Sequence, residues 1–462
     1  MKGLMAFIKE VALMAFLPIL LISQTILPVV QACMTNSQFW VTFFGFMLPS
    51  YMLIVAHFRY QRVNMIKKRY GFTNDLGSYK DMTPDESQAV LKNLAEWDFP
   101  FVFEFGWISE FFKTATAPCL SKVIVNSGHF TSTDQMISHG RQQETVCLMT
   151  QMQVQPLHSR EHALSIARIN EHHSMYGSVI NSDTVLWLSW MWMLGPVQWI
   201  NLIGWRKLQD FEVHAMFIYW REMSVMMGCK WVPNTLAELE NFRQIFAAKE
   251  QKFSHWNCTF SDAMLDSILF SIPGFLKPAG RKCIVAVFDE DVRRCNGYED
   301  EFSPRLRSVL FIVLKAWGLF QRYFCLPRMS PRVLTATTNA NGTVNFPEYT
   351  YPATPYYVKQ TLMNQYGPFA ILNRLRGLPI PAPQFGSNGV TWESVGAKQE
   401  NIDRQLIAET RVLLKYSELT KNPWGFRPNI NFQYKSIAVD PQMGPGYGSP
   451  SNAYKPDALV RL

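Results

Sequence analysis

The chain has 462 residues, enough for two or three domains or for one large helical domain with a tail. Hydrophobic residues make up 48% and charged residues only 17%, which indicates a large buried core and contact with lipid. The net charge of +8 is concentrated in a basic run at residues 59–69, directly after an apolar stretch. That position is typical of the cytosolic flank of a membrane helix and argues against a nucleic acid as partner.

Eight cysteines are scattered along the chain, without a CxxC pair and without the CxxCH site to which haem is attached covalently. Scattered cysteines in a large chain are usually reduced, which is consistent with a cytosolic compartment. Any haem is therefore expected to be bound without thioether links.

Two uncharged segments, residues 11–31 and 39–57, are about as long as the roughly 20 residues that cross a bilayer. The first follows Lys2 and Lys9 and ends near a small residue, so residues 1–32 are a possible signal sequence. The second is the better transmembrane helix. With or without cleavage, this N-terminal membrane region, residues 1–58, leaves the rest of the chain in the cytosol.

Two sequons, at Asn257 and Asn341, would carry glycans only if the body of the protein were luminal. We interpret both as chance matches. The expected location is the endoplasmic reticulum membrane, with the catalytic domain in the cytosol.

A helix is predicted to begin near residue 84, because Thr83 and Glu86 have the spacing of a capping box and Pro84 stands at the first helical position. Residues 185–203 are uncharged and resemble a further span, but Gly195-Pro196 is expected to break them, and a buried core helix is favoured. Helical periodicity predicts further helices at 101–113, 118–126, 134–152, 160–178, 183–194, 207–227, 236–252, 260–270 and 305–324.

From about residue 330 the pattern becomes irregular, with one more amphipathic helix predicted at 399–415. Residues 419–462 are rich in Gly, Pro and Asn and are expected to be an extended or disordered tail. The sequence therefore predicts an all-α fold whose main helical domain covers residues 70–418.

Three polar residues, Arg141, Glu144 and Thr145, are spaced so that they share one face of a helix. Such a face is either a solvated edge or the polar wall of a site. Spacing alone favours the solvated edge.

His173 lies on the next predicted helix, with Tyr176 and Gly177 one turn further on. A lone histidine is usually a packed or surface residue, and the adjacent His172 adds ambiguity. Gly177 favours a ligand role, because it removes a side chain where a flat macrocycle would approach. In a helical haem pocket one neutral imidazole commonly binds the iron, and polar groups on the opposite side set the reactivity.

Other chemistries have weaker support. The motifs HExxH, GxSxG, the Walker loop and GxGxxG after a strand are all absent. His158 and His162 have a spacing that can hold zinc, but no further ligand completes the set, and surface histidines are the better interpretation.

The order of several short motifs resembles one known family, which joins the bacterial latex-clearing proteins (rubber oxygenases) to fungal endoplasmic-reticulum-bound oxygenases of the kind found in mycophenolic acid biosynthesis. The resemblance runs from about residue 39 to about 415. Its motifs are His57-Phe-Arg-Tyr-Gln-Arg, Asp98-Phe-Pro-Phe-Val-Phe103, Arg141-x-x-Glu-Thr145, Ala167-Arg168 to Tyr176, Tyr357-Val-Lys to Pro368, and Ser394-Val-Gly-Ala-Lys398.

The resemblance implies a helical, globin-like core that binds haem b non-covalently. It implies His173, rather than His172, as the iron ligand. We also expect Arg168, Tyr176 and Gly177 to contact the cofactor.

On the opposite side of the haem, Arg141 and Thr145 match the rubber oxygenases, whereas Glu144 replaces their lysine. Asn170 stands where many relatives have arginine. A carboxylate at residue 144 is better suited than lysine to accept a proton.

The expected function is that of a haem-dependent oxygenase in secondary-metabolite biosynthesis, which cleaves a C=C bond in the prenyl chain of a lipophilic substrate. Dioxygen is expected to bind opposite His173, with Arg141 polarising it and Glu144 taking an allylic proton. Two alternatives stay open. One is a haem-dependent oxidase or hydroxylase of a non-terpenoid metabolite, and the other is a cofactor-free helical membrane scaffold.

Overall fold

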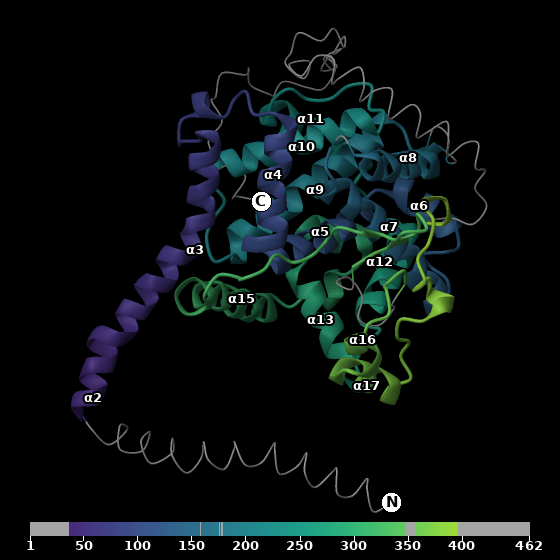
Figure 1. Ribbon diagram of the computed structural model, residues 1–462. Helices are drawn as coiled ribbons and strands as arrows, with labels where there is room; N and C mark the ends of the chain where they lie inside the picture. Colours follow the sequence, from purple (N-terminus) through teal and green to yellow (C-terminus); the bar gives the residue numbers. More distant parts are fainter. Residues whose placement is uncertain (1–36, 158, 175, 177–178, 348–355, 396–462) are drawn as a thin grey trace, which may run out of the picture. The chain divides into compact units, whose positions relative to one another are not determined.

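The computed structural model describes residues 37–157, 159–174, 176, 179–347 and 356–395 (Figure 1). These residues are mostly helical, which confirms the predicted class of fold. The chain divides into two compact units: residues 1–62 with 319–327, and residues 63–318 with 328–462. The predicted signal sequence, the helix at 399–415 and the C-terminal tail lie outside the described residues.

The first unit contains an apolar helix, built from α2 (Ser37–Thr42), a π-helical turn (Phe43–Met47) and the start of α3 (Leu48–Tyr70). From Trp40 to Tyr70 it is long and apolar enough to cross a membrane, by length and composition, and little of it is buried. The predicted span at 39–57 falls almost entirely within it. In the same unit the Tyr51 hydroxyl donates to the Phe324 carbonyl (2.9 Å).

The second unit begins its helical core at α4 (Pro84–Asn93), which starts at the predicted capping box. The Glu86 amide donates to Thr83 Oγ1 (3.3 Å), and the Thr83 amide donates to Glu86 Oε2 (2.8 Å). The predicted helices are found as α5 (Pro100–Thr114), α6 (Pro118–Asn126), α7 (Gln135–Val154), α8 (Arg160–Ser174), α9 (Ser182–Ile203), α10 (Asp210–Met226), α11 (Leu236–Glu250), α12 (His255–Ile268) and α15 (Pro304–Phe324).

Two of the helices that were not predicted follow α12 directly, α13 (Lys277–Val287) and α14 (Glu290–Asn296). Both are short, and their first turns follow Pro and Asp residues that also occur in loops. Together with α12 they pack around a core cluster that includes Phe112, Phe260 and Phe288.

The expected break at Gly195-Pro196 is wrong, because α9 runs through both residues. Proline has no amide hydrogen, so the helix loses one internal hydrogen bond here. Most of α9 is buried, and among the described residues only the helix at Trp40–Tyr70 passes the membrane-span criterion. The buried core helix favoured from the sequence is confirmed.

At Gly195-Pro196 the backbone of α9 lies in close contact with the backbone of α5. A Cβ atom on Gly106 would lie 2.6 Å from the Pro196 nitrogen, and one on Gly195 would lie 2.5 Å from the Gly106 carbonyl oxygen. Only glycine at both positions allows this approach. The contact brings the ring of Trp192 on α9 within 5.7 Å of the Trp107 ring on α5, measured between centroids.

A buried ion network holds the start of α10 against the turn at residues 94–98. Arg206 Nη2 donates to Asp98 Oδ2 (2.8 Å), and Arg206 Nη1 donates to Glu212 Oε2 (2.6 Å). Asp98 opens one of the motifs quoted above, so this motif has a structural role.

The irregular segment after residue 330 contains a two-stranded antiparallel sheet, β1 (Thr337–Thr338) and β2 (Val344–Asn345). It is followed by α16 (Leu362–Tyr366), α17 (Pro368–Leu375) and two single 3-10 turns, Pro383–Phe385 and Trp392–Ser394. The small sheet departs from the predicted all-α fold, whereas α16 and α17 are two further helices that were not predicted.

The substitution Gly195→Ala is expected to destabilise the full-length protein by about 1–3 kcal/mol or more, because the added methyl group meets the backbone of α5, which cannot move aside like a flexible side chain. The matched control is Gly274→Ala, where a Cβ atom meets nothing within 4 Å. Urea unfolding of both variants in detergent measures the difference. Equal midpoints for the two variants would show that the close contact is not required.

Candidate active site

A cavity of about 1080 Å³, its open mouth included, lies between α5, α6, α7, α8 and α9. We call it the histidine chamber, because His172 and His173 both line it. Arg141, Thr145 and Tyr176 supply further polar groups. The rest of the wall is largely apolar and includes Phe111, Leu120, Leu148, Met149, Ile169 and Trp192.

Arg141 and Thr145 face this chamber from α7, so the solvated edge favoured from spacing is wrong for these two residues. Arg141 Nη1 donates to Thr145 Oγ1 (2.8 Å), and its guanidinium group lies 5.7 Å from the centroid of the Phe130 ring. These contacts hold a cation at the wall of a mostly apolar cavity.

Glu144 lies on the same helix but is not among the residues that line the chamber. Its Oε1 accepts a hydrogen bond from the Tyr357 hydroxyl (3.0 Å), and its Oε2 lies 3.9 Å from Arg141 Nη1. Burial and the nearby Glu144 carboxylate raise the pKa of Tyr357, so the phenol is a proton donor at neutral pH. The carboxylate is thus oriented between a phenol and a guanidinium group.

Tyr357 reaches Glu144 from the irregular C-terminal segment, in a backbone conformation that a non-glycine residue rarely adopts (φ 66°). Its carbonyl oxygen accepts hydrogen bonds from the Phe346 amide (3.0 Å) and from Asn345 Nδ2 (3.1 Å). Such strained residues persist where the surroundings hold them, often at functional sites. The sequence alone indicated no role for Tyr357.

The two chamber histidines are neutral at pH 7. Burial, together with the positive charge of Arg141, lowers the pKa of His172 to about 3 and that of His173 to about 4. A neutral imidazole has the free lone pair that a metal ion needs. His173 Nδ1 is also buried without a hydrogen-bond partner. Since both rings line the chamber, the preference for His173 still depends on the family resemblance.

Arg168 does not line the chamber, and its contacts hold elements of the fold together. It is fully buried, forms an ion pair with Glu171 (2.7 Å), and donates through Nε and Nη2 to the Val395 carbonyl (3.2 and 2.8 Å). The contact joins two of the motifs quoted from the sequence, the one at Arg168 and the one at Ser394-Val395. Asn170 Nδ2 donates to the Met226 carbonyl (3.0 Å). Gly177 lies outside the described residues.

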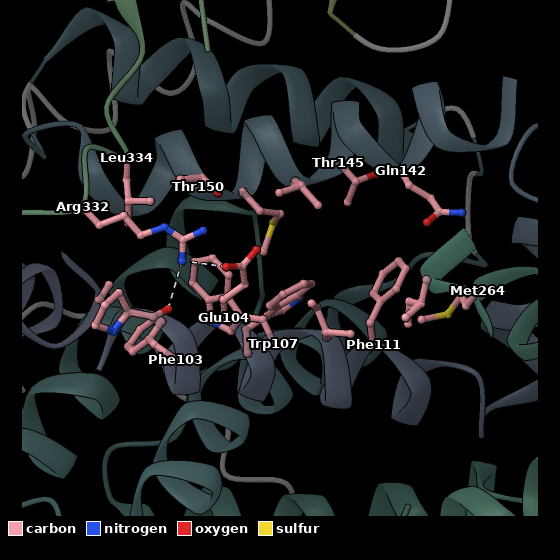
Figure 2. Close-up of a pocket in the computed structure, with 17 residues that line it drawn as sticks. Phe103, Glu104, Trp107, Phe111, Gln142, Thr145, Thr150, Met264, Arg332 and Leu334 are labelled. Atoms are coloured by element: carbon pink, nitrogen blue, oxygen red, sulfur yellow. Dashed lines mark hydrogen bonds and ion pairs between the residues drawn. The ribbon is translucent and has the colours of Figure 1, made fainter. Parts of the chain in front are cut away.

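A second cavity, of about 890 Å³ with its mouth, adjoins the first, and we call it the apolar chamber (Figure 2). Figure 2 shows Trp107 and Phe111 on one side of it and Gln142 and Thr145 on α7 opposite. Both chambers are lined by Phe111, Thr145, Met149 and Trp192, so these four residues form their common wall.

One end of the apolar chamber carries an ion pair that the sequence analysis missed. Arg332 Nη1 lies 2.6 Å from Glu104 Oε2 and donates to the Pro100 carbonyl (3.1 Å) (Figure 2). Burial raises the pKa of Glu104, while Arg332 acts in the opposite direction. Glu104 lies on a predicted helix and Arg332 in an irregular segment, so periodicity gave no signal for their contact.

The two histidines of the histidine chamber suit a metal whose other ligands come from a cofactor rather than from the protein. Among the described residues, no three His, Cys, Asp or Glu side chains form a group that could hold a metal ion. Haem supplies four nitrogen ligands and needs as few as one from the protein. Of the two histidines considered for zinc, His162 is fully buried, not a surface residue, and His158 lies outside the described residues.

Comparison with known proteins finds no matching family model. The chain is similar to the ER-bound oxygenase mpaB' of Penicillium brevicompactum, with 25% identity over 84% of this chain and 96% of that protein. It is also similar to mpaB of the same organism, with 24% identity over 75% of this chain and 85% of that protein. For mpaB of Penicillium roqueforti the identity is 24% over 56% of this chain and 91% of that protein. The resemblance inferred from the motifs is confirmed.

The substitution Arg168→Gln is expected to cost about 3–5 kcal/mol of unfolding free energy, because it leaves the Glu171 carboxylate buried without its cation. Arg294→Gln is the control, since its pair with Asp291 is exposed and is worth about 0–1 kcal/mol. Urea unfolding of the full chain distinguishes the two. Similar midpoints would contradict the structural role of Arg168.

Acidification is expected to destabilise the protein between pH 6.5 and 4. Burial lowers the pKa of His139 to about 4, so in this range the unfolded chain binds a proton that the folded chain does not. His139→Phe should therefore flatten the dependence of unfolding free energy on pH, by up to about 1.4 kcal/mol per pH unit. Unfolding curves at several pH values measure this, and parallel profiles for variant and parent would be the contrary result.

Proposed function

We propose that this chain is a membrane-anchored oxygenase of secondary metabolism that uses haem b and cleaves a C=C bond in the prenyl chain of a lipophilic substrate. The oxygenases named above support the class of reaction. The observation that carries the proposal is the common wall between an apolar chamber and a chamber with two neutral histidines.

The histidine chamber suits haem for three reasons. His173 offers a neutral imidazole with an unpartnered, buried Nδ1. The chamber wall is mostly apolar, as the faces of a porphyrin require, and Arg141 adds one cation near the wall. Bound haem would supply an iron atom that activates dioxygen, a reaction that amino-acid side chains cannot perform.

Arg141 is positioned to stabilise negative charge that develops during the reaction. Its hydrogen bond to Thr145 fixes the guanidinium group before substrate arrives, which is the condition for effective electrostatic stabilisation. Thr145 lines both chambers, so this stabilisation is delivered where the two meet.

Glu144 is the proposed acceptor of the allylic proton. Its carboxylate would accept the proton while the Tyr357 hydroxyl donates to Oε1 (3.0 Å) and Arg141 Nη1 lies 3.9 Å from Oε2. Because Glu144 does not line the chamber, its side chain must turn toward the substrate, or the proton must pass through an intervening group. Tyr357 thus acts as a positioning residue for this carboxylate.

The apolar chamber is the proposed place for the prenyl chain. Aromatic rings and the flexible Met149 and Met264 line it, a surface that adapts to branched hydrocarbons. The Glu104–Arg332 pair at one end provides hydrogen-bonding groups for the polar part of such a substrate.

The proposed location is the endoplasmic reticulum membrane, with the second unit in the cytosol. The candidate membrane helix and its basic flank support this, as does the name of the relatives. The side chain of Asn257 is fully buried and its Nδ2 donates to the Lys252 carbonyl (2.8 Å), so the folded body has no room for a glycan at this sequon. Asn341 is exposed and remains informative.

Absorption spectra of the full-length protein, expressed with haem supplementation, test the proposal. We expect a Soret band that is lost or shifted in His173→Ala and retained in His172→Ala. A spectrum without any Soret band would overturn haem dependence and favour the scaffold. Loss of the band only in His172→Ala would instead assign the ligand to the other histidine.

The reaction is tested separately with the haem-loaded protein and a prenylated substrate under labelled dioxygen. Cleavage gives two shorter carbonyl products with label, whereas hydroxylation gives one product of full chain length. The second result would favour the alternative of a hydroxylase.

A further inference from the structure

The surface of the second unit carries a concentration of large apolar side chains, apart from those exposed on α15, that the proposed function does not use. It comes from α16, α17 and the turn before α13, which Figure 1 shows together on one side of this unit. We call it the apolar patch. Phe369 is 79%, Leu375 81% and Phe275 82% exposed, and the other members are Ile272, Leu276, Leu362, Met363, Tyr366, Ile371 and Leu372.

The parts of the patch belong to one surface. The Arg376 side chain, just after α17, donates to the Ser271 carbonyl, next to Ile272 in the other part of the patch. In α17 only Ala370 is buried, so nearly all of the apolar residues of this helix point away from the core. Single exposed apolar residues are ordinary on soluble proteins, but contiguous groups mark interaction sites.

The segments that carry the patch contain an excess of basic residues, although Arg281 is paired with Asp262 (2.9 Å) and Glu301 (2.8 Å). Residues 271–288 and 356–377 contain no Asp or Glu. They contribute the basic residues Lys277, Arg281, Lys282, Lys359, Arg374 and Arg376. Exposed Phe and Leu side chains beside an excess of Lys and Arg are typical of surfaces that insert into the headgroup region of a membrane with anionic lipids.

We propose that the apolar patch is a second membrane-contact surface, inserted into the headgroup and upper acyl region of the bilayer that the N-terminal helix crosses. The candidate anchor supports this occupant, because tethering to the bilayer keeps lipid at a high local concentration for any further contact. Phe369, Leu375 and Phe275 would then lie among lipid chains, with Arg374 and Lys277 at the level of the phosphates.

Photo-crosslinking in vesicles tests the proposal independently of haem and of catalysis. The full-length protein carries benzoylphenylalanine at residue 369 and is reconstituted in vesicles of phosphatidylcholine and phosphatidylserine. The same probe at Leu375 serves as a second position, and Leu76, exposed (57%) and apolar but outside the patch, is the matched control. All three side chains are exposed, so the probe should not disturb folding.

After illumination we expect covalent protein–phospholipid adducts, seen by mass, at residues 369 and 375 with several-fold higher yield than at residue 76. Adduct yields equal to that of the control would overturn the proposal. Covalent dimers would do so in favour of a second copy of the chain, and crosslinks within one chain would do so in favour of one of its own segments.

Discussion

The contact between the backbones of α5 and α9 is the constraint on which the candidate site depends. Gly106 and Gly195 let the two helices approach until a methyl group no longer fits, and Pro196 continues the helix at this point. The rings of Trp107 and Trp192 lie close together and both line the apolar chamber. The apolar chamber therefore has rigid aromatic walls, built on two helices whose separation cannot vary much.

Different helices contribute different kinds of side chain to the two chambers. Helices α7 and α8 supply the polar side chains, Arg141 and Thr145 from one and the two histidines from the other, whereas α5, α9 and α12 supply apolar walls. Ile268 lines the apolar chamber at the end of α12, and the apolar patch begins four residues later at Ile272. A lipid-soluble substrate would thus leave the bilayer close to the chamber proposed to receive it.

Local signals in the sequence predicted most of the helical fold, because a capping box such as Thr83–Glu86 and helical periodicity act within a few residues. Contacts between distant segments left no such signal. Tyr357 donates a hydrogen bond to Glu144, Arg332 forms an ion pair with Glu104, and Arg168 donates to the Val395 carbonyl. Spacing alone even favoured a solvated face for Arg141 and Thr145, because the cavity that this face borders is formed only when α8 and α9 pack against α7. It was the family resemblance that predicted that this face and the histidines belong to one site.

The central claim is that an imidazole of the histidine chamber binds a haem iron. Electron–nuclear double resonance of the ferric, haem-loaded protein, with histidine labelled by ¹⁵N and all other residues unlabelled, measures this bond directly. The account predicts one strongly coupled ¹⁵N nucleus, in addition to the unlabelled porphyrin nitrogens. A spectrum with porphyrin couplings but no coupled ¹⁵N would contradict the account, because the iron would then have no histidine ligand.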